Sequence, residues 1–283
     1  MEEPHKIGLI FGSGELPQAV LEGALSAGHE VYIIGLQDHM PSLPDGHNID
    51  EFSIGKFGSI IKALRSNKCT HICFAGHVDR PDFKNIKPDF QGWRKLPGAI
   101  SAARQGDDAL LSYLLEVFES SGFEIIAPQT LCAHILMPDG HLGNVKMAEI
   151  HRGDAEKACR IAKDIGALDI GQGAIVCDGL VLAVEAQEGT DAMLLRISDL
   201  PISKRGTPSA RRGVLAKMVK PGQEMRVDLP TIGPETIELA DKAGLAGIVT
   251  EGGQSFVLGR DTVKSKADAC GIFIAGLPPL KPL

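Results

Sequence analysis

The chain has 283 residues and a net charge of −7 at pH 7, with 33 glycines and few aromatic residues (one Trp, two Tyr and ten Phe). Its length predicts about two domains, and a chain of this size can bury a substantial core without a disulfide or a metal. The acidic charge argues against non-specific nucleic-acid binding, because such binding requires a broad basic surface that displaces counterions from phosphates.

The six cysteines contain no C-x-x-C pair, and several lie within apolar runs such as HICFAG and AIVCDG. This pattern is typical of buried thiols in a reducing cytosol rather than of a disulfide framework or a zinc site. No apolar run approaches the ~20 residues that are needed to span a bilayer. We therefore expect a cytoplasmic protein that is at most peripheral on the cytoplasmic face of the inner membrane.

Strand and helix patterns alternate through the first half of the chain. Apolar strands are predicted at residues 6–12, 31–36, 70–76 and 123–128, and helices at 16–28, 59–66 and 107–122. Near-continuous apolar strands that alternate with helices are typical of a parallel sheet covered on both faces. We predict a nucleotide-binding-like domain of Rossmann type over residues 1–136.

The second half has a different pattern. Apolar positions recur at helical spacing between Val145 and Ile165, which predicts a long helix within a connecting segment at residues 137–166. From Gly171 onward, short apolar runs alternate with glycine turns, and few helices are predicted. The predicted fold class is α/β, with an N-terminal Rossmann-like parallel-sheet domain and a distinct mixed α/β catalytic domain at 167–283.

The first chemical motif is the loop GSGELP, which follows the first strand and includes Gly12, Ser13 and Gly14. Glycines let a phosphate approach the backbone, and the free N–H groups at a helix start attract negative charge. The dinucleotide fingerprint is incomplete, because Pro17 replaces its third glycine and the second strand ends without a ribose-binding acid. The loop therefore predicts either a mononucleotide or diphosphate contact or a purely structural turn, and it argues against a redox NAD site.

A long loop is predicted from Gly76 to Gly98. It holds the only tryptophan, Trp93, together with Phe83 and Phe90, interleaved with five lysines and arginines. Aromatic residues mixed with cations can meet an acyl chain and its phosphate, or a membrane surface. The alternative is that the aromatic side chains pack onto their own domain. The acids Asp107 and Asp108, which follow this loop, fit the first turn of a helix.

Acidic residues cluster after an apolar run in the second half. The run Leu180 to Val184 predicts a buried strand, and Glu185, Glu188 and Asp191 follow it. Carboxylates this close together repel one another unless a cation or hydrogen-bond donors neutralise them. Mg²⁺ prefers one or two carboxylates with water and phosphate oxygens. The pattern predicts a metal site, and the alternative is a solvated hairpin turn.

Two further charged positions lie downstream. Asp228 occupies a turn between apolar runs, and Lys217 lies within the apolar run VLAKMV, eleven positions earlier. A lysine in a strand either faces solvent or, if it faces the acidic cluster, supplies a positive charge for a phosphate.

Five segments together carry a family resemblance over almost the whole chain. They are GLIFGSGELP, GDDALL, GQGAIVCDGLVLAVEAQEGTDAMLLR, KPGQEMRVDLPTIGPETIELADKAGLAGIVTEGG and ADACGIFIAG. These segments resemble the UDP-2,3-diacylglucosamine pyrophosphatase of lipid A biosynthesis, LpxI type. The resemblance implies Mg²⁺- or Mn²⁺-dependent hydrolysis of UDP-2,3-diacylglucosamine to UMP and 2,3-diacylglucosamine 1-phosphate (lipid X). It also implies water attack on the α-phosphorus, a substrate held between two domains, and a homodimer.

The resemblance also implies roles for individual residues. The essential aspartate of the family's VDLPTIGP segment corresponds to Asp228, which we expect to bind the metal or orient water, with Lys217 on the diphosphate. Further metal ligands are expected at Glu185 and Asp191. The expected substrate-binding residues are Gly12, Ser13, Gly14, Gln172, Glu188, Thr190 and Lys217.

One departure from the family pattern is visible, because His77 stands where the family usually has lysine in G-K-V. An acylated substrate implies transient contact with the inner-membrane surface. A nucleotide-dependent oxidoreductase is disfavoured by the incomplete fingerprint. A non-catalytic nucleotide-sugar sensor remains the alternative, because the same acids can bind without catalysing.

Overall fold

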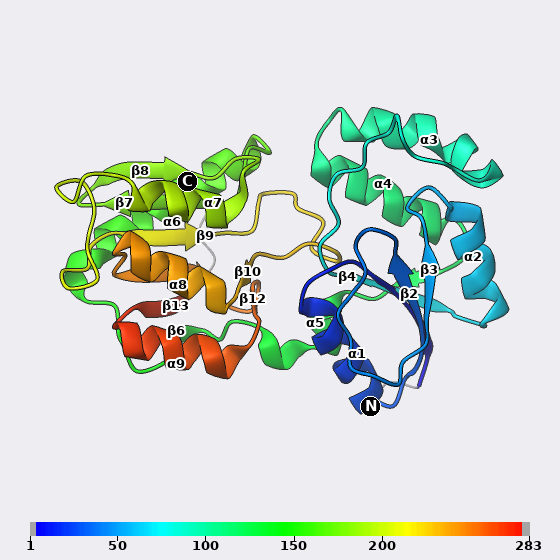
Figure 1. Cartoon of the computed structure of the whole chain (residues 1–283), viewed down its shortest axis with the longest axis horizontal. Coiled ribbons are helices and arrows are strands. Elements are labelled where there is room, and N and C mark those ends of the chain that lie inside the picture. The colour runs from blue at the N-terminus through cyan, green and yellow to red at the C-terminus, as the bar shows by residue number, and fades with distance from the viewer. Residues whose placement is uncertain (1–3, 279–283) are drawn as a thin grey trace. The chain divides into compact units, whose positions relative to one another are not determined.

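The computed structural model describes residues 4–278 (Figure 1). It divides into two compact units. Unit 1 comprises Met1–His134 together with the short segment Glu224–Asp228, and unit 2 comprises Ile135–Gln223 and Leu229–Leu283. The segment that contains Asp228 therefore belongs to unit 1, although it lies far along the sequence, among residues of unit 2.

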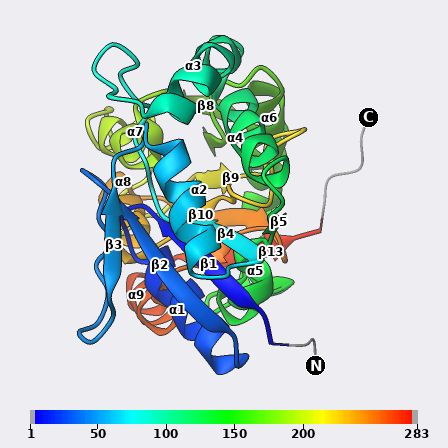
Figure 2. The ribbon, with the colours of Figure 1, turned by 90° about the vertical axis from the view of Figure 1, so that its right-hand side faces the viewer.

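Unit 1 is built on a five-stranded parallel sheet in the order β3-β2-β1-β4-β5, which Figure 2 shows from β3 on the left to β5 on the right. Its strands are β1 (Lys6–Phe11), β2 (Glu30–Leu36), β3 (Ile49–Phe52), β4 (His71–Ala75) and β5 (Glu124–Ile125). Its helices are α1 (Leu16–Ser26), α2 (Phe57–Ser66), α3 (Phe90–Ala103), α4 (Asp107–Glu119) and α5 (Pro128–Leu131), and the short 3-10 helix η1 (Ala133–Ile135) follows. The predicted Rossmann-like parallel sheet is confirmed.

The central strands of unit 1 are covered on both faces. Ile7, Leu9 and Phe11 of β1 are fully buried, and Ile34 and Ile72 on the neighbouring strands are buried with them. This explains why the strands read as continuous apolar runs rather than as alternating ones.

The predicted loop from Gly76 to Gly98 was wrong at its C-terminal end, because helix α3 begins at Phe90. Asp89 caps this helix by accepting a hydrogen bond from the Gly92 N–H at 2.8 Å. Gly98 permits close packing on α4, since a Cβ there would lie 2.4 Å from the Tyr113 hydroxyl. The helix was missed because Gly92, Pro97 and Gly98 all have low helix propensity.

Unit 2 contains a six-stranded mixed sheet in the order β6-β13-β11-β9-β7-β8 and a two-stranded pair β10-β12. The strands are β6 (Gly140–Leu142), β7 (Gly173–Cys177), β8 (Leu180–Val184), β9 (Val214–Lys217), β10 (Thr231–Ile232), β11 (Gly247–Glu251), β12 (Phe256–Val257) and β13 (Phe273–Leu277). The helices are η2 (Glu149–His151), α6 (Arg152–Ala167), α7 (Gly189–Ser198), α8 (Pro234–Ala243) and α9 (Arg260–Cys270). Strands β9, β11 and β13 run parallel, and β6 and β7 run antiparallel to them, which confirms a mixed α/β domain.

Helix α6 begins at Arg152 rather than at the predicted Val145. The chain between β6 and the 3-10 helix η2 is irregular, and the Asp268 carboxylate holds it by accepting hydrogen bonds from the Asn144 N–H at 2.6 Å and from the Asn144 side chain at 2.8 Å. The helix then packs a face of small residues, including Ala158 and Ala162, against the sheet of unit 2.

The strand predicted at Leu180 to Val184 exists as β8, but it is not buried along its length. Leu180 and Val181 are 57% and 45% exposed. The reason is that β8 is the edge strand of the sheet, which an apolar run alone does not reveal.

Candidate functional site

The glycine loop of unit 1 lies at the carboxyl ends of β1 and β4. Gly12 N–H donates to the Ala75 carbonyl at 2.9 Å, and Ser13 and His77 exchange backbone hydrogen bonds at 2.9 and 2.8 Å. Gly12 has no space for a side chain, because a Cβ there would lie 2.3 Å from the His77 carbonyl oxygen. Gly14, which follows, has a positive φ of 94°.

The glycine loop lies at the topological switch point of the parallel sheet, where the strand order reverses. The chain leaves β1 toward β2 on one side and β4 lies on the other, so the strand order reverses here. Ligands of open α/β sheets bind in the crevice at such a switch point, outside the carboxyl ends of the strands. The loop Gly12-Ser13-Gly14 and the turn Gly76-His77 are therefore brought together where a phosphate group would bind, and α1 begins directly after them.

The His77 side chain projects from this turn and is 73% exposed. Its Nε2 lies 3.1 Å from the Asp79 carboxylate, and the same carboxylate lies 3.8 Å from Nδ1 of His39. A neighbouring carboxylate competes with any anion for the imidazole.

In unit 2, three residues singled out in the sequence meet at one edge of the sheet. Gln172 directly precedes β7, Glu185 directly follows β8, and Lys217 ends β9. The strand register makes them neighbours, because Gly173 pairs with Lys217. The Glu185 N–H also donates to the Gly173 carbonyl at 2.8 Å, and the Met218 N–H donates to the Gln172 carbonyl at 2.9 Å.

Two buried acceptor atoms at this edge lack a hydrogen-bond partner among the described residues. They are Oε2 of Glu185, which is only 6% exposed as a residue, and Oε1 of Gln172. The other Glu185 oxygen accepts a hydrogen bond from the Thr190 hydroxyl at 3.0 Å. An unpaired buried carboxylate oxygen is energetically costly. This arrangement therefore fits a site that receives a cation or the donor groups of a ligand.

Glycine makes room for the Glu185 carboxylate. A Cβ on Gly173 would lie 2.5 Å from Glu185 Oε2, and a Cβ on Gly171 would lie 2.3 Å from the Glu185 carbonyl oxygen. The two glycines on either side of Gln172 thus leave the space that the buried Glu185 occupies.

The remaining acids of this region have other environments. Glu188 forms an ion pair with Arg196 at 2.7 Å. Asp191 is exposed in the first turn of α7, where its charge also favours the helix dipole. Within residues 4–278, no three His, Cys, Asp or Glu side chains form a group that could hold a metal ion.

The ammonium group of Lys217 forms a hydrogen bond within unit 2. Its Nζ donates to the Thr231 carbonyl at 2.9 Å, and the side chain is half-buried. Lys217 therefore does not simply face solvent. It contacts the chain three residues after Asp228, at the start of β10.

Asp228 itself ends the short segment that belongs to unit 1. The Asp228 N–H donates to the Glu224 carbonyl at 3.2 Å, which closes a turn, and Gln129 Nε2 donates to the Met225 carbonyl at 3.0 Å. Asp228 is half-buried. Its sequence neighbours thus attach it to helix α5 of the first unit.

Arg226 provides the strongest polar attachment of this segment. Its guanidinium pairs with Glu224 at 2.7 Å and with Glu119 of α4 at 2.6 Å. The hydrogen bonds that Arg226 donates to Glu224 and then to Glu119 raise the pKa of Arg226, and the hydrogen bond accepted from Arg226 lowers the pKa of Glu224. Two residues before Asp228, the chain is therefore held by a charge-assisted network that the sequence did not reveal.

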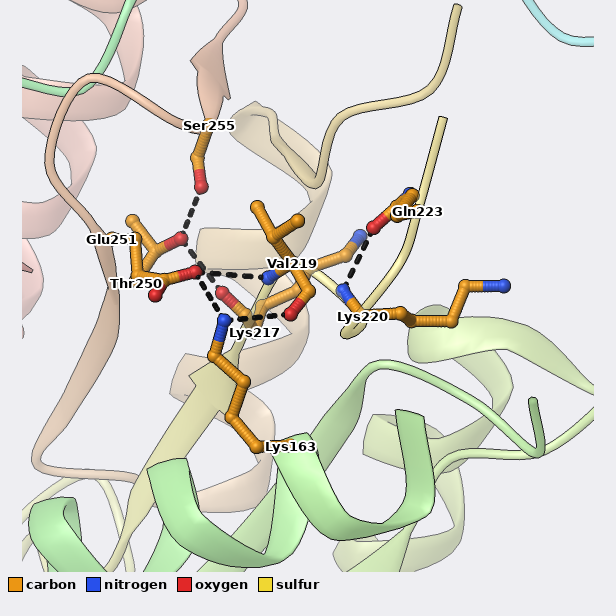
Figure 3. A network of polar contacts seen from close by, with 8 residues as sticks. All are labelled: Lys163, Lys217, Val219, Lys220, Gln223, Thr250, Glu251 and Ser255. Carbon is orange, nitrogen blue, oxygen red and sulfur yellow. Dashed lines mark hydrogen bonds and ion pairs between the residues drawn. The ribbon is translucent and has the colours of Figure 1, made fainter. Parts of the chain in front are cut away.

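A second network holds the chain where it leaves β9 (Figure 3). Lys163 Nζ donates to Glu251 Oε2 and to the Val219 carbonyl, both at 2.8 Å, and the Val219 N–H donates to the same Glu251 oxygen at 3.3 Å. Glu251 is only 2% exposed. The Thr250 hydroxyl, next to it, donates to the Lys217 carbonyl at 2.7 Å.

This network was missed in the sequence, because Lys163 and Glu251 lie 88 positions apart. One signal was available. Glu251 ends the apolar run of β11 with no polar residue but Thr250 before it, and a carboxylate in that position is rarely buried without a partner.

Comparison with known proteins identifies the family. The model of the LpxI N-terminal domain matches residues 6–135, and the model of the LpxI C-terminal domain matches residues 138–275. The chain belongs to the LpxI family. A curated relative from Caulobacter vibrioides is 50% identical over 275 residues, which cover 97% of this chain and 98% of the relative. That LpxI relative carries the name UDP-2,3-diacylglucosamine pyrophosphatase, so the resemblance predicted from the sequence is confirmed.

Within residues 4–278, no helix combines the length and the apolar character that crossing a membrane requires.

Proposed function

We propose that this LpxI-family chain hydrolyses UDP-2,3-diacylglucosamine to UMP and 2,3-diacylglucosamine 1-phosphate in lipid A biosynthesis. The observation that carries this proposal is the 50% identity to the Caulobacter pyrophosphatase over nearly the full length of both proteins. Both family models support it, because together they match most of the chain.

In unit 1, the glycine loop is the proposed contact for the nucleotide diphosphate. Gly12, Ser13 and Gly14 lie at the switch point of the sheet, and α1 follows with the free N–H groups of its first turn. These groups bind an anion through the backbone, so we expect little dependence on the Ser13 side chain.

In unit 2, the buried acceptors are the proposed polar contacts. Thr190 holds one oxygen of Glu185 and leaves the other for a cation or a donor. Gln172 presents a second buried acceptor for the nucleotide or for water. Lys217 supplies positive charge at the same edge, and Glu188 is proposed to act at the rim, where Arg196 already pairs with it.

Metal dependence is proposed on the chemistry of these donors. The unpaired oxygen of Glu185 fits a divalent cation, and Asp191 and Asp228 are the further proposed ligands, since Mg²⁺ needs few carboxylates and completes its shell with water and phosphate. A bound Mg²⁺ or Mn²⁺ would neutralise the diphosphate and lower the pKa of water.

Asp228 is proposed to orient the attacking water, which bonds to the α-phosphorus next to uridine. The bond from that phosphorus to the bridging oxygen breaks, and the acylated sugar leaves as its 1-phosphate with the bridging oxygen. Hydrolysis in ¹⁸O-enriched water tests this step. The label is expected in UMP, and label in the acylated sugar 1-phosphate would mean attack on the β-phosphorus.

The decisive test of the activity is incubation of the purified chain with substrate and Mg²⁺ or Mn²⁺, with UMP measured by chromatography. Release of UMP supports the enzyme. Binding of intact substrate without release would instead support the alternative, a nucleotide-sugar sensor. A homodimer and transient contact with the inner-membrane surface are also proposed, from the family resemblance and from the acylated substrate. Sedimentation tests the homodimer, and binding to lipid vesicles tests the membrane contact.

A further inference from the structure

Helix α3 has an apolar side that faces away from its own domain. We define the α3 face as Phe90, Trp93, Leu96, Pro97 and Ile100. Phe90 and Trp93 are 79% and 64% exposed, which is unusual for the largest apolar side chains. From Trp93, these positions recur at helical spacing, so they share one side of the helix.

The opposite side of α3 already packs on its domain. Its small residues Gly92, Ala99, Ala102 and Ala103 are buried, and α3 lies along α4 at the upper end of unit 1 in Figure 1. The α3 face is therefore not needed for the core of unit 1. The interpretation that these aromatic residues pack onto their own domain was wrong for Phe90 and Trp93.

Two shallow grooves flank the exposed aromatic residues, and cations lie in each. One groove of about 440 Å³ is lined by Trp93, Leu96, Pro97, Ile100, Ser101 and Arg104. The other, of about 520 Å³, includes Phe90 together with Lys62 and Arg65 of α2. Apolar surface bordered by basic residues is thus a local feature of this helix pair.

The charge of the region is opposite to that of the chain. Residues 80–106 contain six lysines and arginines and two aspartates, although the net charge of the chain is −7. One of these cations, Arg80, is paired with Asp107, and Asp89 is occupied by the helix cap. Among the described residues, Lys62, Arg94 and Arg104 form no ion pair, so they can neutralise an external anion.

We propose that the α3 face lies in the interfacial region of a bilayer that contains anionic phospholipids. Trp and Phe prefer this region, because it accepts an apolar ring beside polar head groups. Apolar burial and attraction of Lys and Arg to anionic lipid add to one another in amphipathic helices. The surface deepens the proposed function, because a doubly acylated substrate resides in a membrane from which the enzyme must take it.

Trp93 is the only tryptophan of the chain, so its fluorescence reports on this helix alone. The full-length protein is mixed with vesicles of phosphatidylglycerol and phosphatidylcholine, and with vesicles of phosphatidylcholine alone. Flotation with the anionic vesicles, a blue shift of Trp93 emission and quenching by brominated lipid are expected. No flotation, or flotation without a change in Trp93 emission, would overturn the proposal, and equal binding to both vesicles would contradict the role of charge.

Two variants test the residues directly. Phe90→Ser combined with Leu96→Ser leaves Trp93 as the reporter and should weaken vesicle partition by roughly tenfold or more, because apolar surface is no longer buried. The matched control is Ile150→Ser with Leu168→Ser in unit 2, where exposure is 82% and 72%. The control should bind vesicles like the wild type, and equal loss in both variants would overturn the assignment. Dimerisation that is lost in the α3 variant, without vesicle binding by the wild type, would assign the face to a second copy of the chain.

Measuring UMP release from two forms of the substrate distinguishes the membrane-binding role of the α3 face from the proposed enzymatic function. With substrate dispersed in detergent, the α3 variant should release UMP at the wild-type rate, whereas with vesicle-borne substrate its rate should fall by roughly the same factor as its partition. Failure of the wild type to release UMP in detergent would count against the function alone. An equal loss with both forms of substrate would count against the surface.

Discussion

The two candidate regions differ in how their polar groups are satisfied. At the glycine loop of unit 1, the Gly12 N–H already donates to the Ala75 carbonyl, and Ser13 and His77 exchange backbone hydrogen bonds. At the sheet edge of unit 2, Glu185 and Gln172 present buried side-chain oxygens without partners. A loop that is held by backbone hydrogen bonds keeps its shape when the Ser13 side chain is replaced. An unpaired buried acceptor, by contrast, requires a cation or a hydrogen-bond donor from a ligand. We therefore expect substitutions of side chains in unit 2, and at Asp228, to have much larger effects than substitution of Ser13.

The largest effect is expected for Asp228→Ala. Loss of a carboxylate that acts mainly in the transition state should lower kcat by ~10³-fold or more, which is about 4 kcal/mol, while substrate still binds. Steady-state kinetics and substrate binding measure the two parts. The kcat of Asp228→Asn should lie between those of the wild type and Asp228→Ala, because asparagine keeps the shape of the side chain and loses its charge. Asp261→Ala, at an exposed aspartate in the first turn of α9, is the control, and turnover of the Asp228 variant within about threefold of wild type would reduce Asp228 to a turn residue.

The next effect concerns the buried carboxylate of unit 2. Glu185→Gln keeps the size of the side chain and removes its charge, so the concentration of Mg²⁺ or Mn²⁺ for half-maximal activity should rise by about 10- to 100-fold. Thermal stability should not fall, because the change removes a buried charge. Ser13→Ala is the comparison variant and should leave the metal requirement unchanged. Full UMP release in excess EDTA would reject the metal assignment for the wild type.

A smaller effect is expected at Arg226. Arg226→Leu removes the pairs with Glu224 and Glu119 that hold the segment before Asp228. We expect kcat to fall by roughly tenfold with little change in KM, because a misplaced catalytic group affects the transition state more than binding. Lysine at this position should recover part of the rate, since it keeps one ion pair. The guanidinium is partly exposed, so stability should change little, and a loss of folding rather than of kcat would contradict the positioning role.

The smallest expected effect is on the thermal stability of unit 1, which should depend on pH through His71. Burial, followed by repulsion from His5, lowers the pKa of His71, although Glu124 opposes this. A base with a folded pKa below its unfolded value binds more protons when unfolded, so its contribution to stability is present above the unfolded pKa of about 6.5 and is lost as the pH falls. Unit 1 should therefore melt earlier in weak acid.

Calorimetry on either side of about pH 6.5 checks this expectation. His71→Gln should reduce the acid-induced fall in Tm, and His47→Gln, at a half-buried histidine of the same unit, should not. An unchanged fall in the His71 variant would show that other groups control the acid sensitivity.

Much of the fold follows from local patterns. Apolar periodicity and glycine turns predicted the parallel sheet of unit 1, because every residue in such strands is buried on one face or the other. The same local reasoning missed α3, because its glycines and proline lower its helix propensity. It also placed the start of α6 too early, in a segment next to which Asp268 accepts a hydrogen bond from the Asn144 N–H. It also could not tell that β8 lies at an edge, since that depends on which strands pair.

From the sequence alone, the family, the fold class and the glycine loop could be established, because segments of consecutive residues carry each of them. The grouping of Gln172, Glu185 and Lys217 arises only from strand register in unit 2. The attachment of Asp228 to unit 1 depends on Arg226 reaching Glu119, 107 positions away, and the burial of Glu251 depends on Lys163. These features come from contacts between distant residues, and only packing brings distant residues together.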